Sequence, residues 1–112
     1  MKDNNKLNQL IETLKSKQKG LWKKVAYELN KPRRKRVEVN ISKLDVYSKD
    51  GSTILVPGKI LGSGTTSKKL EVAAFSYSLL AKQLIEAKGG KLHSIEDLLK
   101  SNPEGKNVII IK

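Results

Sequence analysis

Apolar residues near the N-terminus recur at the spacing of an amphipathic helix. A break at Gly20 separates this pattern from a second one, over residues 21–29, which Asn30 and Pro32 bring to an end. We therefore predict two short helices in the first third of the chain. The apolar stripe of the first helix is Leu7, Leu10, Ile11 and Leu14, and that of the second is Leu21, Trp22, Val25, Ala26 and Leu29.

The pattern changes after the second predicted helix. Residues 31–36 have no apolar side chain apart from Pro32, which predicts an exposed loop, and alternation over residues 37–39 indicates a short strand. Asn40 is placed to cap one or two helical turns in which Asp45 faces water. Asp50-Gly51 is a turn signal. The apolar set of these helical turns is Ile41, Leu44 and Tyr47.

The middle of the chain predicts short strands. Two are expected at residues 53–56 and 59–61, on either side of Pro57-Gly58. A glycine-bearing loop follows at residues 62–64. The next strand is expected from its alternating residues, Leu70, Val72 and Ala74.

The last third alternates helices and strands. Ser76 is expected to open a helix that Gly89-Gly90 stops. Ser94, with Asp97 three residues later, resembles a capping box for a further helix that ends before Pro103. Strands are expected at residues 91–93 and 108–111. The stripe of the first of these helices is Tyr77, Leu80, Ala81, Leu84 and Ile85, and that of the second is Ile95, Leu98 and Leu99.

These elements predict an α/β fold in which helices dominate the first third. A chain of 112 residues, 38% of them apolar, is expected to be one small domain. Because it has no cysteine, disulfide scaffolds, zinc ribbons and thiol catalysis are excluded. No apolar run approaches the ~20 residues of a membrane-spanning helix, and the start lacks a signal-peptide pattern. We therefore expect a soluble intracellular protein.

Positive charge is concentrated near the N-terminus. The chain carries 23 Lys and Arg against 11 Asp and Glu, a formal net charge of +12. Residues 1–36 hold +9 of this excess, residues 37–69 hold +2 and residues 70–112 hold +1. A large positive charge favours polyanionic partners. We therefore expect residues 1–36 to bind the polyanion.

The densest cluster of charge is the segment KPRRKR at residues 31–36, called the basic loop below. Its five positive charges repel one another in isolation. When they bind a phosphate backbone, the counterions of the nucleic acid are released, which favours binding. Pro32 limits the freedom of the loop, and arginine suits forked contacts with phosphate oxygens. The alternative is a solvated or targeting cluster. Flanking lysines favour nucleic acid: Lys15, Lys17, Lys19, Lys23 and Lys24.

Two aromatic residues lie close to the basic loop. Trp22 and Tyr27 have the ring systems needed to stack on bases. Aromatic residues at helical spacing are more often part of a core, and we expect that role for both.

The segment GKILGSG at residues 58–64 has glycines but not the spacing of a nucleotide-binding loop. Gly62 comes one residue too early and Ser63 stands where such a loop needs lysine. The glycine pattern of a dinucleotide-binding loop is not matched either, because Ser67 occupies the position of the third glycine. We expect a tight backbone segment whose N–H groups contact RNA phosphates.

No catalytic or metal-binding constellation is found. His93 is the only histidine and is expected to be structural. Glu96 and Asp97 suit the first turn of a helix rather than a paired acid and base. Ser76 and Ser78 lack the pattern of a nucleophile elbow.

Four segments together carry a resemblance to a known family. In order, they are KPRRKRVEVNISKL, VPGKILGSG, LEVAAFSYSLLAKQLIEAKGG and SIEDLLKSNPEGKNVIIIK. The chain resembles, over essentially its whole length, the archaeal and eukaryotic large-subunit ribosomal protein eighteen family, which is related to bacterial large-subunit protein fifteen. Its short length looks archaeal. The resemblance implies strand-strand-helix units in an irregular superhelical arrangement, preceded by helical structure, and a role in binding large-subunit ribosomal RNA.

The resemblance also carries over to individual positions. It looks weaker at Thr65-Thr66, where relatives often have an acidic residue and leucine, and at residues 109–111, where arginine is common. The basic loop of the family falls on Lys31, Arg33, Arg34, Lys35 and Arg36, and its glycine segment falls on Gly58, Lys59, Gly62 and Gly64.

We therefore expect a basic helical segment with its loop at residues 1–36 and a compact α/β core at residues 37–112. The expected function is that of a structural constituent of the large ribosomal subunit, in the cytoplasm, with ribosomal RNA and neighbouring ribosomal proteins as partners. Neither a cofactor, a metal, a membrane nor a small-molecule substrate is expected. The expected RNA-binding residues are Lys23, Lys24, Lys31, Arg33, Arg34, Lys35, Arg36, Lys59, Gly62, Gly64, Lys68 and Lys69.

Two other classes of function stay open. The first is a basic DNA-binding or architectural nucleoid protein, although no recognition helix or basic zipper pattern is present. The second is a small enzyme, for which no residue set offers a starting point.

Overall fold

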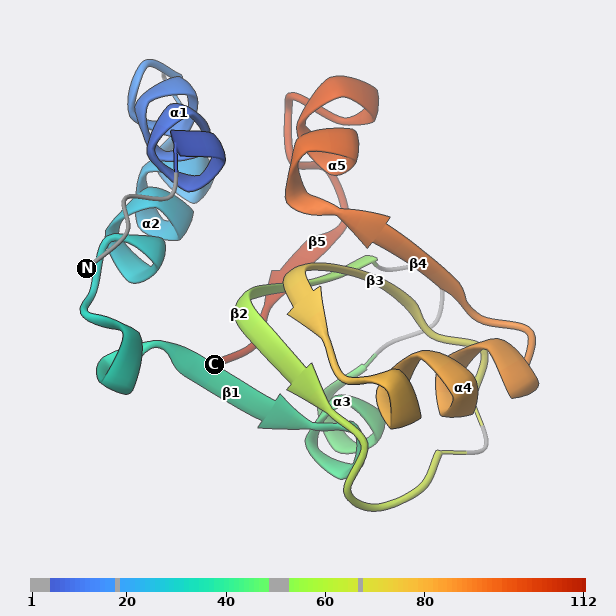
Figure 1. Ribbon diagram of the computed structural model, residues 1–112. Coiled ribbons are helices and arrows are strands. Elements are labelled where there is room, and N and C mark those ends of the chain that lie inside the picture. The colour runs from blue at the N-terminus through green and yellow to red at the C-terminus, as the bar shows by residue number, and fades with distance from the viewer. Residues whose placement is uncertain (1–4, 18, 49–52, 67) are drawn as a thin grey trace.

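A computed structural model describes residues 5–17, 19–48, 53–66 and 68–112. It confirms the α/β class, and its elements are arranged as in Figure 1. The predicted turn at Asp50-Gly51 lies outside the described residues. The elements are α1 (Asn5–Lys15), α2 (Gly20–Leu29), the 3-10 helix η1 (Arg33–Lys35), β1 (Val37–Asn40), α3 (Ile41–Tyr47), β2 (Thr53–Leu61), β3 (Glu71–Tyr77), α4 (Leu79–Ala87), β4 (Lys91–Ser94), α5 (Ile95–Ser101) and β5 (Val108–Ile110).

All strand pairs of the sheet are parallel. The strand order is β1-β2-β3-β4, and β5 also pairs with β2. Parallel strands need a crossover connection, and α3, α4 and α5 each lie in one such connection. Since β3 occupies one edge of β2, β1 and β5 share the other edge. β5 pairs with residues 53–55 of β2 and β1 pairs with residues 58–61.

β2 is one continuous strand, so the prediction of two short strands around Pro57-Gly58 was wrong. The register shifts between Val56 and Lys59, where three steps along β2 match two steps along β3. Such a bulge accommodates a proline, which has no N–H for the ladder, within a central strand. Gly58 is also required here, because a Cβ atom at this position would lie 2.1 Å from the carbonyl oxygen of Val37.

Helices cover both faces of the sheet, as Figure 1 shows, and each face has its own apolar cluster. Alternation along β2 sends Leu55 to one face and Ile54 and Val56 to the other. The first cluster joins α1, α2 and α5 to the sheet: Leu7, Leu10, Ile11, Leu14, Trp22, Val25, Ala26, Leu29, Leu55, Ala73, Ile95, Leu98 and Leu99. The second joins α3 and α4: Val39, Ile41, Leu44, Ile54, Val56, Ile60, Leu70, Val72, Ala74, Ala81, Ile85 and Ile111.

Both predicted N-terminal helices are confirmed, and their apolar stripes face the first cluster. Trp22 is fully buried, and its Nε1 donates a 2.8 Å hydrogen bond to the carbonyl oxygen of Pro103, after α5. The division of the chain after Arg36 stays a prediction, and the first cluster contains residues from both of the predicted segments.

The start of α4 differs from the prediction. Ser76 and Tyr77 belong to β3, where they pair with Lys59 and Ile60 of β2. The helix is capped by Ser78, whose side chain accepts a 3.1 Å hydrogen bond from the N–H of Ala81. Tyr77 was included in the predicted helical stripe because it lies three positions before Leu80, a spacing that also fits a helix.

α3 and α5 are confirmed with changes in detail. Asn40 occupies the N-cap of α3, but its side chain makes no capping hydrogen bond. Tyr47 is exposed and not part of the apolar set, and half-buried Asp45 accepts a 2.6 Å hydrogen bond from Thr66 instead of facing only water. Ser94 caps α5 as predicted, by accepting from the N–H of Asp97.

The remaining strands lie close to their predicted places. β4 extends one residue further than expected, to Ser94, and β5 ends one residue earlier, at Ile110. β5 is half-buried, while Ile111 after it is buried and donates its N–H to Leu55 of β2. In the part of the chain that the structure describes, no helix combines the length and the apolar character needed to cross a membrane.

Candidate nucleic-acid interface

The basic loop connects α2 to β1 and contains one turn of 3-10 helix. The N–H of Lys35 donates to the carbonyl oxygen of Pro32 at 2.8 Å, and the N–H of Arg36 donates to that of Arg33 at 3.2 Å. Arg33, Arg34 and Lys35 are all exposed. Their side chains make no hydrogen bond or ion pair with any other described residue, so three cations project from one short turn.

Lys31 has a different environment from these three residues. Its Nζ lies 2.9 Å from Oε1 of Glu28 and 5.3 Å from the centroid of the Tyr27 ring. Its carbonyl oxygen accepts a 3.1 Å hydrogen bond from Nε of Arg36. Lys31 and Arg36, both half-buried, therefore tie together the two ends of the basic loop.

Glu28 is the acidic residue beneath the basic loop, and its side chain is only 4% exposed. Its Oε2 accepts a 2.9 Å hydrogen bond from Nζ of Lys112. Its Oε1 forms an ion pair with Lys31, whose Nζ lies 2.9 Å away. The hydrogen bond from Lys112, and then the contact with Lys31, hold the pKa of Glu28 below its ordinary value although burial opposes this. The same contact raises the pKa of Lys31.

The sheet explains how Lys112 reaches Glu28. β5 and β1 share one edge of β2, so the chain that leaves β5 meets the chain that enters β1 beside the bulge. Sequence reasoning missed Glu28. The available signal was an acidic residue three positions before Lys31, the spacing of a helical ion pair.

α2 places its lysines on the outer side of the helix. Lys23 and Lys24 are exposed, whereas Trp22, Val25, Ala26 and Leu29 face the core. The expected core role of Trp22 is confirmed. That of Tyr27 is wrong, because its side chain is 67% exposed. At 100° per residue, Tyr27 falls on the same outer side as Lys23, four residues earlier.

The glycine segment lies where the chain passes close to two helices. A Cβ atom on Gly62 would lie 2.6 Å from Cγ of Leu80, at the start of α4. Gly64 has a φ of +89°, and a Cβ atom there would lie 2.6 Å from Cβ of Ser42 in α3. These contacts explain both glycines by packing, while the contact of their N–H groups with RNA stays a prediction.

The other predicted lysines lie in three different settings. Lys59 is half-buried in β2, in register with Glu38 of β1. Lys68 donates its Nζ to the carbonyl oxygen of Asp45 and to the hydroxyl of Ser48, which engages its charge at the end of α3. Lys69 is exposed. These three lysines therefore differ in burial and in hydrogen-bond partners, and their contact with RNA stays a prediction.

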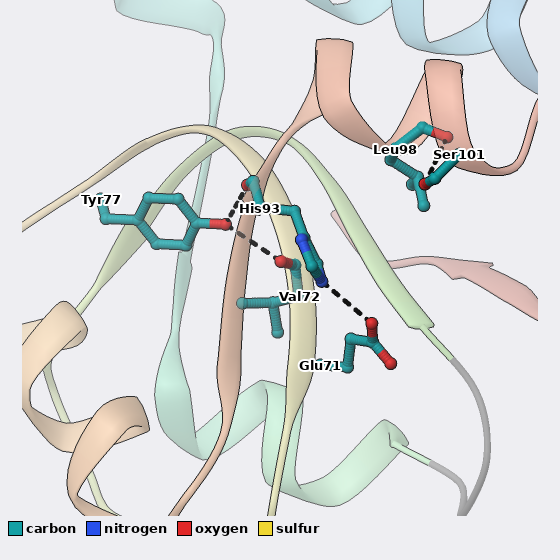
Figure 2. Close-up of polar contacts among 6 residues, drawn as sticks. All are labelled: Glu71, Val72, Tyr77, His93, Leu98 and Ser101. Atoms are coloured by element: carbon teal, nitrogen blue, oxygen red, sulfur yellow. Dashed lines mark hydrogen bonds and ion pairs between the residues drawn. The ribbon is translucent and has the colours of Figure 1, made fainter.

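The single histidine joins two strands, as Figure 2 shows. Nε2 of His93 on β4 lies 2.9 Å from Oε2 of Glu71 on β3. The Tyr77 hydroxyl donates a 2.6 Å hydrogen bond to the carbonyl oxygen of His93, and that of Val72 lies 3.2 Å away. Among the described residues, no group of three or more His, Cys, Asp or Glu has the arrangement of a metal site.

Comparison with known proteins identifies relatives over nearly the whole chain. A family model that describes ribosomal proteins 50S-L15 and 50S-L18e, together with a 60S counterpart, matches residues 4–93. Proteins named large ribosomal subunit protein eL18 are similar to the chain. That of Methanococcus maripaludis is 46% identical over 99% of this chain and 96% of its own length. That of Archaeoglobus fulgidus is 45% identical over 96% and 95%, and that of Methanothermobacter thermautotrophicus is 43% identical over 99% and 95%.

Proposed function

The chain belongs to the family of ribosomal proteins 50S-L15, 50S-L18e and their 60S counterpart, and we propose that it binds large-subunit ribosomal RNA through α2 and the basic loop. As a member of this family, the chain is a structural constituent of the large subunit of the cytoplasmic ribosome rather than an enzyme. Neighbouring ribosomal proteins are proposed as its other partners.

The observation that carries the proposal is the display of three unpaired cations on one turn. Arg33, Arg34 and Lys35 are exposed and have no partner among the described residues. Three such charges repel each other, and a phosphate backbone relieves the repulsion while it releases counterions. Lys23 and Lys24 extend the positive surface along α2.

Other predicted residues contribute less strongly to the proposal. The charge of Lys68 is already engaged with α3, and Lys31 is paired with Glu28. Lys59, Lys69 and the N–H groups of Gly62 and Gly64 are proposed as a second set of contacts. Affinity is expected to depend mainly on the basic loop and on α2.

Replacing Arg33, Arg34 and Lys35 together with alanine tests the proposal. If each residue neutralises one phosphate, the magnitude of the slope of log affinity against log salt falls by about 2–3, at about 0.7–0.9 per contact. The measurement is a salt titration of binding to a transcript of large-subunit ribosomal RNA. The matched control replaces Lys82, Lys88 and Lys100, which removes the same charge from exposed positions on α4, after α4 and on α5.

If the slope of log affinity against log salt changes equally in the two triple variants, the interface is not at the basic loop. Competition with duplex DNA in the same assay separates this function from the DNA-binding alternative. Preference for the DNA would favour an architectural nucleoid protein.

A further inference from the structure

We propose that Glu28, an acidic residue, is a positioning residue that strengthens RNA binding by holding the basic loop in place. The inference rests on the proposed function, since it concerns the same interface. It concerns how the loop is ordered and not which groups contact the phosphates.

The first step of the argument is the position of Glu28 in the structure. The side chain is 4% exposed and lies in the last turn of α2, three positions before the first residue of the basic loop. Burying a carboxylate is costly unless it is paired, and Glu28 has an ammonium group 2.9 Å from each of its oxygens. These groups belong to Lys31 and Lys112.

The second step is the route from Glu28 to the loop. Glu28 holds the ammonium group of Lys31, and the carbonyl oxygen of Lys31 in turn holds Nε of Arg36. Both ends of the loop are therefore fixed through one carboxylate. The three free cations lie between these ends, on the turn closed by the N–H groups of Lys35 and Arg36.

The third step concerns the cost of binding. A chain segment that is ordered before binding loses less conformational entropy when it binds. The five positive charges within the six residues of the loop repel one another. Without the contact to Glu28, the loop is therefore expected to adopt more extended and more varied conformations. Lys112, two residues after β5, contributes by holding the second oxygen of Glu28, so that the carboxylate has a fixed position.

Replacing Glu28 with glutamine gives a sharp test. The change in net charge and the loss of loop positioning are expected to change RNA affinity in opposite directions. The variant gains one unit of net positive charge, and attraction to RNA alone would therefore leave binding equal or tighter. If Glu28 positions the loop, E28Q binds a ribosomal RNA transcript about tenfold more weakly. The matched control is E12Q on α1, where Glu12 is exposed and its carboxylate has no partner among the described residues.

Two further measurements separate positioning from loss of the fold. Emission of Trp22, the single tryptophan and fully buried, verifies that each variant is folded at the assay temperature. Amide hydrogen exchange is expected to accelerate at Lys35 and Arg36 in E28Q, while amides of β2 and β3 keep their protection. A flexible polyanion such as poly(U) is expected to lose less affinity than the transcript, because it adapts to a mobile loop.

The outcomes distinguish the two proposals. Binding of E28Q equal to that of E12Q, or unchanged exchange at Lys35 and Arg36, would overturn the role of Glu28 while the interface stands. An unaffected affinity after alanine replacement of Arg33, Arg34 and Lys35 would overturn the interface itself.

Discussion

At the scale of single residues, two glycines have opposite requirements. A Cβ atom on Gly58 would lie 2.1 Å from the carbonyl oxygen of Val37, in the main chain of the paired strand. A Cβ atom on Gly20, the first residue of α2, would meet no atom within 4 Å. The same methyl group is therefore accommodated at one site and not at the other.

We expect Gly58→Ala to lower the free energy of unfolding by about 1–3 kcal/mol, because β1 must shift away from β2. Gly20→Ala is expected to raise it by about 0.4–1 kcal/mol, because alanine restricts the unfolded chain and suits a helix. Urea unfolding followed by circular dichroism measures both. An unchanged midpoint for Gly58→Ala would mean that the two strands separate without cost.

Tyr77 predicts how stability responds to alkaline pH. Burial raises the pKa of its phenol to about 12 from an ordinary value of 10.0. Between these pH values, the unfolded chain releases a proton that the folded chain retains. The free energy of unfolding is therefore expected to fall as pH rises from 10 to 12. The fall is less than about 2.7 kcal/mol, because the phenol is only half-buried.

Unfolding midpoints measured across this pH range test the expectation, with Tyr77→Phe as the comparison. The phenylalanine variant lacks the phenol and should lose this part of the pH dependence. At pH 7 it is expected to be about 1 kcal/mol less stable, since the carbonyl oxygen of His93 loses its donor. The same slope in both proteins would assign the titration to another group.

Glu28 shows why one contact at the proposed interface was not predicted from the sequence. The basic loop is visible as a run of charge, and its exposed turn is where the run predicts it. The partner of Glu28, Lys112, lies 84 residues away, and only the shared edge of β2 brings the two together. Charge patterns in the sequence are local, whereas this contact depends on topology.

At the scale of elements, α3, α4 and α5 differ in the hydrogen bonds that their N-cap side chains make. Ser78 and Ser94 accept hydrogen bonds from backbone N–H groups of α4 and α5, whereas the side chain of Asn40 makes none with α3. Replacing either serine with alanine is expected to cost about 1 kcal/mol. Asn40→Ala is expected to cost clearly less. Thermal unfolding of the three variants measures this order, and equal losses would contradict it.

Helices were predicted best where the buried stripe is the dominant pattern. α1, α2 and α5 follow from their apolar spacing, and Ser94 was identified as a cap from Asp97 three residues later. β2 and β3 were not predicted in full, because their length is fixed by pairing with each other. Pro57 reads as a break in the sequence, but a bulge accommodates it in the sheet.

At the scale of the whole molecule, the net charge of +12 affects binding and stability in opposite directions. Added salt is expected to weaken RNA binding by about 10³–10⁵ between 50 and 200 mM if 6–10 phosphates are contacted. The same salt is expected to raise the melting temperature of the free protein, because it screens the repulsion among its own cations. Binding titrations and thermal scans over one salt series measure both effects. An RNA affinity that does not change with salt concentration would contradict the electrostatic mechanism.

The shared edge of β2 also has a consequence for the newborn chain. Synthesis proceeds from the N-terminus, so α2 and the basic loop are made long before β5 and Lys112. Until then Glu28 has only Lys31 as a partner, and residues 53–55 of β2 lack their neighbour on that edge. We therefore expect the most basic segment to be held less tightly in a growing polypeptide than in the finished protein. The final anchoring of that segment follows synthesis of the chain beyond β5.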